Sequence, residues 1–306
     1  MTSPAPAPLA DATWKERQER SNQVLLRLMT ALSLASGRRA SRWVLHLIAA
    51  YFTLFAPAAR RASRRYLARA LGRPPRLADV YRHVLAFAST IHDRIYLLNG
   101  RWSEFDIEVE GQEAIHAACA DGRGLLLMGA HLGSFEVMRC LGRSQGGFAV
   151  SMLMYEENAR KINAALAAIN PAAVQDIIPL GRMESMIQAQ ARIEEGHLVG
   201  MLADRSIGGD PARLIDFLGA PAAFPLGPWR MAAMLRRPVL LMTGLYLGGR
   251  RYHVQFELLA DFSRVERTGR DAAMEAAQRR YVQRLEHYCR QAPYNWFNFF
   301  DFWHQP

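Results

Sequence analysis

The sequence predicts an α/β protein in which a largely parallel sheet is flanked by helices and follows a helical N-terminal region. Beyond residue 105, short apolar runs of strand length alternate with segments of helical periodicity. Such alternation is typical of a parallel sheet covered on both faces. Half of the 306 residues are hydrophobic, enough for a globular core. Because the chain has no internal repeat or long linker, we expect residues 105–306 to form one core integrated with helices from residues 13–104.

The first hundred residues are expected to be helical after a short tail. Residues 1–12 are rich in Ala and Pro and carry no early positive charge, which favours a disordered tail over a secretory signal. An amphipathic helix is predicted over 14–35, with Gly37 ending it. A second helix is predicted over 78–99, where apolar residues recur at helical spacing.

The core elements follow in alternating order. Strands are predicted at 105–109, 124–130, 148–154, 176–180, 197–203, 213–218, 238–247 and 252–259. Helices are predicted at 112–121, 134–143, 158–169, 183–195, 226–236 and 268–291. The last two strands flank Gly248 and Gly249, which favours an antiparallel hairpin.

Positive charge is concentrated in the N-terminal third. The chain has a net charge of +10, yet residues 1–100 alone hold 16 Lys/Arg against 5 Asp/Glu. Within them the apolar segment 43–59 lies between Arg clusters at 38–42 and 60–65. This arrangement favours association with an anionic membrane surface, as an interfacial or short anchoring segment. A helix buried against the core is the alternative, since 17 residues are at the short limit for a span.

The clearest candidate site lies in residues 124–136. An apolar run ends at His131, Gly133 and Ser134 form a turn, and Glu136 follows. An imidazole can take a proton from a hydroxyl, and a carboxylate can hold its tautomer and stabilise the imidazolium. The free backbone N–H groups around Gly133 and Ser134 are candidate donors to an oxyanion. A histidine that merely ends a strand is the alternative.

The His-x4-Glu motif resembles that of glycerolipid and lipid A acyltransferases, and the chain is most similar to the lauroyl/myristoyl acyltransferases of lipid A biosynthesis. Further stretches strengthen the resemblance over residues 40–303: Leu202-Ala-Asp204-Arg205, Asp216-Phe-Leu-Gly-Ala-Pro-Ala222 and the aromatic segment Pro293–Trp303. In many relatives Asn precedes the His, whereas this chain has Ala130. This departure leaves the acceptor open.

Two Arg residues and an Asp are candidates for substrate binding. His131 and Asp204 both follow predicted strands, so their side chains are expected at the same edge of the sheet. Asp204 would position Arg205 or Arg182, and an Arg there can bind a phosphate or carboxylate with two hydrogen bonds. A structural ion pair at Asp204-Arg205 and a solvated Arg182 are the alternatives.

Several other function classes lack their motifs. The chain has no Gly-x-Ser-x-Gly elbow, Walker A run, Gly-x-Gly-x-x-Gly run or His-Glu-x-x-His motif. It also lacks a nucleic-acid-binding signature. Its three cysteines, Cys119, Cys140 and Cys289, have neither zinc nor disulfide spacing, which fits a reducing compartment. We therefore expect no metal. The family resemblance implies no cofactor beyond an acyl thioester co-substrate.

The sequence hypothesis is an enzyme at the cytoplasmic face of a bacterial inner membrane. His131 acts as general base, and Glu136 orients it through the second ring nitrogen. The resemblance implies an acyl thioester donor, on acyl-carrier protein or CoA, and a hydroxyl of a lipid A-type glycolipid. Two alternatives remain: the same chemistry on a lysophospholipid, an aminolipid or a membrane-tethered secondary metabolite, or a non-catalytic lipid-binding scaffold.

Overall fold

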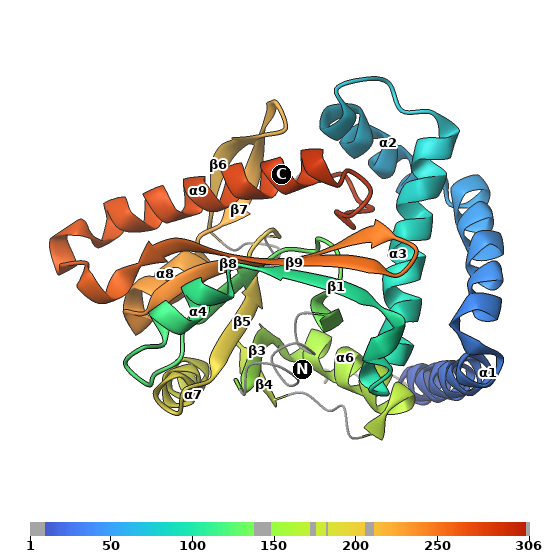
Figure 1. Cartoon of the computed structure of the whole chain (residues 1–306), viewed down its shortest axis with the longest axis horizontal. Coiled ribbons are helices and arrows are strands. Elements are labelled where there is room, and N and C mark those ends of the chain that lie inside the picture. Colours follow the sequence, from blue (N-terminus) through green and yellow to red (C-terminus); the bar gives the residue numbers. More distant parts are fainter. Residues whose placement is uncertain (1–9, 138–147, 172–175, 182, 206–210, 304–306) are drawn as a thin grey trace, which may run out of the picture.

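The computed structural model describes residues 10–137, 148–171, 176–181, 183–205 and 211–303. It confirms the predicted fold class: a seven-stranded, mostly parallel sheet flanked by helices (Figure 1). The strand order in this sheet is β1-β9-β8-β2-β5-β3-β4. Its strands are β1 (Asp106–Glu110), β2 (Leu126–Gly129), β3 (Val150–Tyr155), β4 (Asp176–Leu180), β5 (Leu198–Leu202), β8 (Pro238–Gly248) and β9 (Arg251–Asp261).

Strand pairing follows the sequence expectation closely. β4, β3, β5, β2 and β8 are mutually parallel, and β9 returns antiparallel to β8 through the hairpin expected at Gly248 and Gly249. One hairpin was only half predicted: β6 (Ala212–Phe217) pairs with β7 (Ala220–Pro225), which the sequence analysis missed. Leu218 and Gly219, both with positive φ, make the two-residue turn between them.

Helices precede and alternate with the strands. Gly37 interrupts α1 where the helix was predicted to end, with non-helical φ and ψ, and a second helical stretch follows this kink up to Phe55. The Arg-rich segment after residue 56 is itself helical, which was not predicted, with Pro57 at its start and Gly72 in a left-handed C-cap. α1 already begins at Ala10, inside the predicted tail. The helices are α1 (Ala10–Phe55), α2 (Pro57–Leu71), α3 (Leu77–Leu98), α4 (Gln112–Ala118), α6 (Glu156–Ile169), α7 (Met183–Glu194), α8 (Gly227–Leu235) and α9 (Arg270–Gln291).

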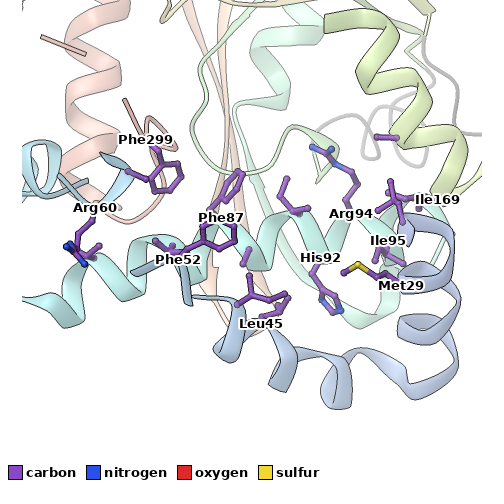
Figure 2. Close-up of a pocket in the computed structure, with 18 residues that line it drawn as sticks. Met29, Leu45, Phe52, Arg60, Phe87, His92, Arg94, Ile95, Ile169 and Phe299 are labelled. Atoms are coloured by element: carbon purple, nitrogen blue, oxygen red, sulfur yellow. The ribbon is translucent and has the colours of Figure 1, made fainter. Parts of the chain in front are cut away.

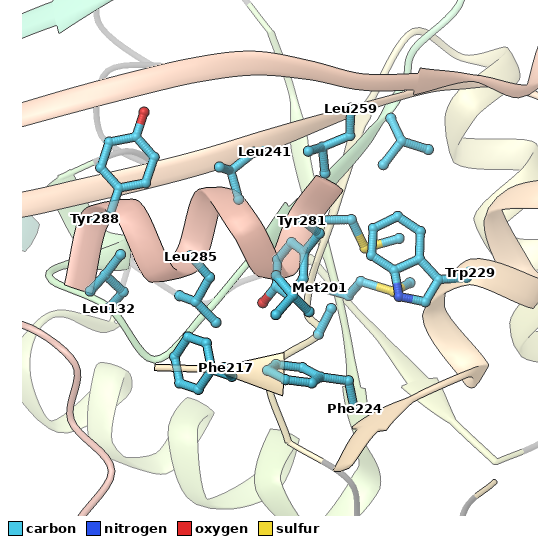
Figure 3. Packing of buried hydrophobic residues seen from close by; sticks show 14 of the residues in the cluster. Leu132, Met201, Phe217, Phe224, Trp229, Leu241, Leu259, Tyr281, Leu285 and Tyr288 are labelled. Carbon is cyan, nitrogen blue, oxygen red and sulfur yellow. The ribbon is translucent and has the colours of Figure 1, made fainter. Parts of the chain in front are cut away.

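Both faces of the sheet are buried. Successive side chains of a strand point to opposite faces. Leu126 and Met128 of β2 join one apolar cluster, whereas Leu127 and Leu125, the residue just before the strand, join another. The first cluster packs under α9, where Tyr281 and Trp229 are fully enclosed (Figure 3). Burial on both faces explains why β2 reads as one continuous apolar run.

A buried ion pair fastens α1 to α3 just after the kink at Gly37. Arg38 donates two hydrogen bonds to the Asp93 carboxylate, at 2.7 and 2.8 Å, and a third to the carbonyl of Gly249 in the β8–β9 hairpin. Tyr252 donates to the same carboxylate. Burial opposes ionisation of Asp93, but its hydrogen-bond donors and the Arg38 charge hold its pKa below the ordinary value. The helices thus meet the sheet at a defined place.

Candidate active site

The loop after β2 lies between β8 and the C-terminal segment and is bonded to both. Gly133 has φ +70°, and a Cβ there would collide with the carbonyl oxygen of Gly244 in β8. Gly133 and Gly244 form a parallel bridge, while Leu132 pairs antiparallel with Trp296 from the C-terminal segment. The loop that carries His131 is therefore fixed from both sides.

Asp204, at the carboxyl end of β5, holds His131 twice. Its Oδ1 lies 2.9 Å from Nδ1 of the imidazole, and its Oδ2 accepts the backbone N–H of His131 at 3.1 Å. The Asp204 side chain is completely buried, whereas a third of the His131 side chain is exposed. The expected meeting of His131 and Asp204 at one edge of the sheet is thus present across 73 positions of sequence.

The charge of Asp204 is stabilised where it lies. Burial alone would raise its pKa, but the facing His131 and the hydrogen bonds from that residue hold the pKa of Asp204 below its ordinary value. An ionised carboxylate only accepts hydrogen bonds, so Nδ1 carries the imidazole proton. Nε2 is then the basic nitrogen of a neutral His131.

The aromatic C-terminal segment, residues 293–303, closes the site; we call it the C-terminal strap. Trp296 donates its indole N–H to Oδ2 of Asp204 at 3.0 Å. The backbone N–H of Phe297 donates to the carbonyl of His131 at 2.8 Å. Trp296 is fully buried, whereas Phe300 is exposed, so the aromatic residues of the strap divide between core and surface. The strap thereby builds part of the site.

The backbone N–H groups assigned to an oxyanion are already used. Gly133 donates to the carbonyl of Asn295 at 2.9 Å, and Ser134 donates to the carbonyl of Gly244 at 2.7 Å. A backbone N–H has one proton, so neither group remains for substrate. The sequence expectation therefore does not hold for these two N–H groups, which fix the shape of the loop instead.

Glu136 lies beside Arg94, and Asp204 occupies the position at the imidazole that was predicted for Glu136. The buried carboxylate of Glu136 is 3.5 Å from Nε of Arg94, on α3. The ring nitrogen that the sequence hypothesis reserved for Glu136 is held by Asp204 instead. The pattern His-x4-Glu drew attention to the nearer carboxylate, but the fold brings the distant one to Nδ1.

Arg205 stands beside this centre, and Arg182 lies outside the described residues. Arg205 donates from Nη2 to the carbonyl of Phe297 at 2.9 Å, and its guanidinium sits 5.2 Å from the ring centre of Phe300. Burial lowers the pKa of Arg205, partly offset by the Asp204 charge. Among the described groups its buried Nε has no hydrogen-bond partner. Arg205 is therefore a largely buried cation that interacts with Asp204 and has donor capacity left among the described groups.

The family model of the bacterial lipid A biosynthesis acyltransferases matches residues 24–305. The chain belongs to this family. A comparison with curated proteins finds no match. The match covers the sheet and most of the N-terminal helices, so it includes every residue of the site described above.

An apolar groove in this lipid A acyltransferase family member runs between α1 and α3. Its volume is about 510 Å³, within the range of ligand sites. Figure 2 shows Phe299 and Arg60 toward one end and Arg94 and Ile169 toward the other. Since Arg94 also contacts Glu136, the groove begins next to the loop of His131. Phe87, in the groove wall, packs edge-on against Phe297 of the strap.

The outer face of α1 carries unusually large exposed apolar side chains in this family member. Trp43, Leu47 and Phe55 are each more than two-thirds exposed. Within the described part of the chain, no single helix is long and apolar enough to cross a membrane. The pair Leu26–Phe55 and Pro57–Leu71, bent by 94°, meets the length and composition criteria together. The predicted segment 43–59 spans that bend.

Sequence reasoning missed the roles of Trp296 and Arg94. The strap was noted for its aromatic density, and an indole N–H that must find a partner when buried was the available signal for Trp296. Arg94 carried no such signal, because nothing local distinguishes it from the other arginines of residues 1–100.

Proposed function

We propose that this protein transfers a fatty acyl group from an acyl thioester to a hydroxyl of a lipid A-type glycolipid, with His131 as general base. The observation that carries the proposal is the buried Asp204 carboxylate on Nδ1 of His131. A carboxylate in this place fixes the tautomer with a basic Nε2 and stabilises the imidazolium as it forms. Membership of the family supports acyl transfer as the reaction.

The proposed step moves one proton and exchanges one bond. Nε2 of His131 takes the proton of the acceptor hydroxyl while that oxygen attacks the thioester carbonyl carbon. The tetrahedral oxyanion then collapses, the C–S bond breaks, and the thiolate leaves with the proton returned by His131. The products are an O-acyl ester and a free thiol. General-base help of this kind contributes roughly 10²–10⁴ in rate.

Arg205 is our candidate for the developing oxyanion. The N–H groups of Gly133 and Ser134 are committed to carbonyls, whereas Nε of Arg205 has hydrogen-bonding capacity left among the described groups. A fixed cation next to the reacting carbonyl stabilises charge without reorganising water. Glu136, paired with Arg94, is proposed to set the wall between the His131 loop and the groove.

The groove is proposed to hold the acyl chain. It is lined almost entirely by apolar side chains, and its Arg94 end adjoins Glu136. Hydrocarbon gains about 0.8 kcal/mol for each methylene group removed from water. The thioester would then lie at the mouth of the groove, near His131, and its carrier, acyl-carrier protein or CoA, would remain outside.

The face of α1 and the arginines of α2 are proposed to sit on the cytoplasmic face of the bacterial inner membrane. Exposed Trp43 and Leu47 provide apolar contact, and the arginines at 60–65 complement anionic headgroups. The lipid acceptor and the product would both stay in the bilayer. No nucleic-acid partner is proposed.

The test is acyl transfer by detergent-purified protein. It receives acyl-carrier protein loaded with mixed acyl chains, or the matching acyl-CoAs, and a total bacterial lipid extract, and mass spectrometry identifies the product. His131→Ala is expected to lose at least roughly 10²-fold in turnover, while His287→Ala, at an exposed position of α9, stays close to wild type. Equal turnover in His131→Ala with intact folding would remove this mechanism.

The same experiment separates the alternatives. An acylated lysophospholipid or aminolipid would keep the chemistry and change the acceptor, as Ala130 allows. Lipid binding without any product from either donor would favour the non-catalytic scaffold.

A further inference from the structure

Four hydrogen bonds in series connect α2 with the imidazole of His131. The hydroxyl of Ser63, on α2, lies 2.9 Å from Nδ1 of His83 on α3. Nε2 of His83 lies 2.9 Å from the backbone oxygen of Trp296. The Trp296 indole N–H reaches Oδ2 of Asp204 at 3.0 Å, and Oδ1 of Asp204 meets Nδ1 of His131 at 2.9 Å.

Donors and acceptors along this series are fixed by chemistry. A backbone oxygen only accepts, so Nε2 of His83 carries the proton, and Nδ1 accepts from the Ser63 hydroxyl. Burial lowers the pKa of His83 to about 4, so the ring is neutral at pH 7. Ser63, His83, Trp296 and Asp204 have side chains that are almost or fully buried, and solvent does not compete for these bonds.

The series gives Trp296 a double attachment. Its backbone oxygen is held by His83 and its indole by Asp204. The ring also packs edge-on against Tyr66 and Phe217, at 5.0 and 5.2 Å between ring centres. The carboxylate of Asp204 therefore meets a donor that cannot swing away, and its two oxygens stay aimed at the ring and the main chain of His131.

We propose that Trp296 is a positioning residue of the active site, fixing Asp204 and through it the tautomer and direction of His131, and that His83 anchors Trp296. This proposal rests on the proposed function for its effect on turnover. It does not rest on it for its effect on His131 itself, which exists without substrate. The sequence around His131 alone does not predict its dependence on Trp296.

The first test removes the donor and keeps an aromatic ring. Trp296→Phe is compared with Trp303→Phe, which deletes the other indole N–H of the strap. That N–H is bonded to the Phe217 carbonyl at 3.2 Å and lies outside the hydrogen-bond series, while the Trp303 ring packs against Trp296, so this variant controls for aromatic packing. A misdirected catalytic group costs on the order of 10²-fold, so we expect kcat of Trp296→Phe to fall by roughly 10- to 100-fold with little change in KM for the acyl donor. Trp303→Phe should stay near wild type.

The second readout needs no substrate. In protein labelled with ¹⁵N-histidine, a proton on Nδ1 of His131 that is hydrogen-bonded to a carboxylate gives a low-field resonance, assigned by its loss in His131→Gln. We expect Trp296→Phe to lose or shift this resonance and Trp303→Phe to retain it. If wild type shows the resonance yet forms no product, the acyl-transfer proposal fails while the positioning of His131 stands.

His83 offers a check against a purely structural effect. Gln places a donor where Nε2 of His83 lies, whereas Leu of similar size has none. We expect His83→Gln to keep the His131 resonance and most of kcat, and His83→Leu to lose both. Wild-type kcat and an unchanged resonance in Trp296→Phe would overturn the proposal, as would equal losses in His83→Gln and His83→Leu.

Discussion

Asp204 holds both the ring and the main chain of His131, with one carboxylate oxygen 2.9 Å from Nδ1 and the other 3.1 Å from the backbone nitrogen. A side chain held at two points has little freedom to present the wrong nitrogen to a substrate. The arrangement makes a carboxylate 73 positions away more important to the ring than the Glu of the local motif.

Replacing Asp204 by Asn tests that ranking. The amide would offer its N–H₂ to Nδ1 and favour the tautomer with the proton on Nε2, where it blocks proton abstraction. We expect kcat to fall by about 10⁴-fold, the loss known for such a replacement in a catalytic triad. Acyl transfer and circular dichroism are measured together, with Asp216→Asn, at an exposed position of β6, as the control. A loss below tenfold would contradict the assignment.

Glu136 and Arg94 should act as one unit. Because the two side chains pair at 3.5 Å, Glu136→Gln and Arg94→Gln are each expected to lower kcat. The kcat of the double variant should then be no lower than that of the less active single variant. The measurement is a double-mutant cycle on acyl transfer. Additive losses would show that Glu136 acts independently of Arg94.

Filling the groove should shorten the preferred acyl chain. Ala88 lines the groove on α3, and Ala88→Leu adds bulk there. Each methylene that no longer finds room costs about 0.8 kcal/mol, or about fourfold in kcat/KM. Competition between donors of different length measures the shift. Ala78→Leu, exposed on the same helix, should leave the preference unchanged; an equal shift there would contradict the placement of the chain.

His83 should make folding stability depend on pH below neutrality. The folded state keeps His83 neutral because its pKa is lowered to about 4, whereas the unfolded chain takes up a proton near pH 6.5. The unfolded state then binds more protons, so stability falls as pH drops, by about 1.4 kcal/mol per pH unit between pH 6.5 and 4. Denaturant unfolding of wild type and His83→Gln at pH 7 and pH 5 measures this. A slope equal in both would exclude His83 as its source.

Charges on the outer face of α1 should weaken membrane binding. Leu47 is 73% exposed, and its transfer into the interface is worth about 1.5–3 kcal/mol. Leu47→Glu should therefore reduce binding to vesicles containing anionic lipid by tenfold or more, as followed by co-sedimentation. Leu214→Glu, at a residue 70% exposed on the β6–β7 hairpin, should bind as wild type. If Leu214→Glu weakens binding as strongly, α1 is not the contacting face.

Local sequence patterns predicted most of the sheet, because strands buried on both faces of a parallel sheet are short continuous apolar runs. β2, β4 and β5 lie within a residue or two of their predicted limits. β7 was missed because Ala and Pro dilute its alternation, and α2 because its arginines suggested charge before helix. Contacts between segments that lie far apart in the sequence, by contrast, cannot be predicted from local patterns.

The site was predictable only in part for the same reason. His131 and Asp204 could be placed at one edge of the sheet from strand ends alone. Which carboxylate reaches Nδ1, and which N–H groups remain available, depends on the strap returning to the β2 loop. That pairing, Leu132 with Trp296, joins residues 164 positions apart in the sequence, and neither segment carries a local pattern that predicts it.

The position of the strap in the chain also affects the order in which parts of the protein can fold during synthesis. It follows every other described helix and strand in the chain, so the ribosome delivers it after them. Until Asn295, Trp296 and Phe297 arrive, the His131 loop lacks its antiparallel partner and Asp204 lacks its indole donor. A nascent chain can therefore form its sheet and its exposed apolar α1 face while the proposed catalytic centre is still incomplete.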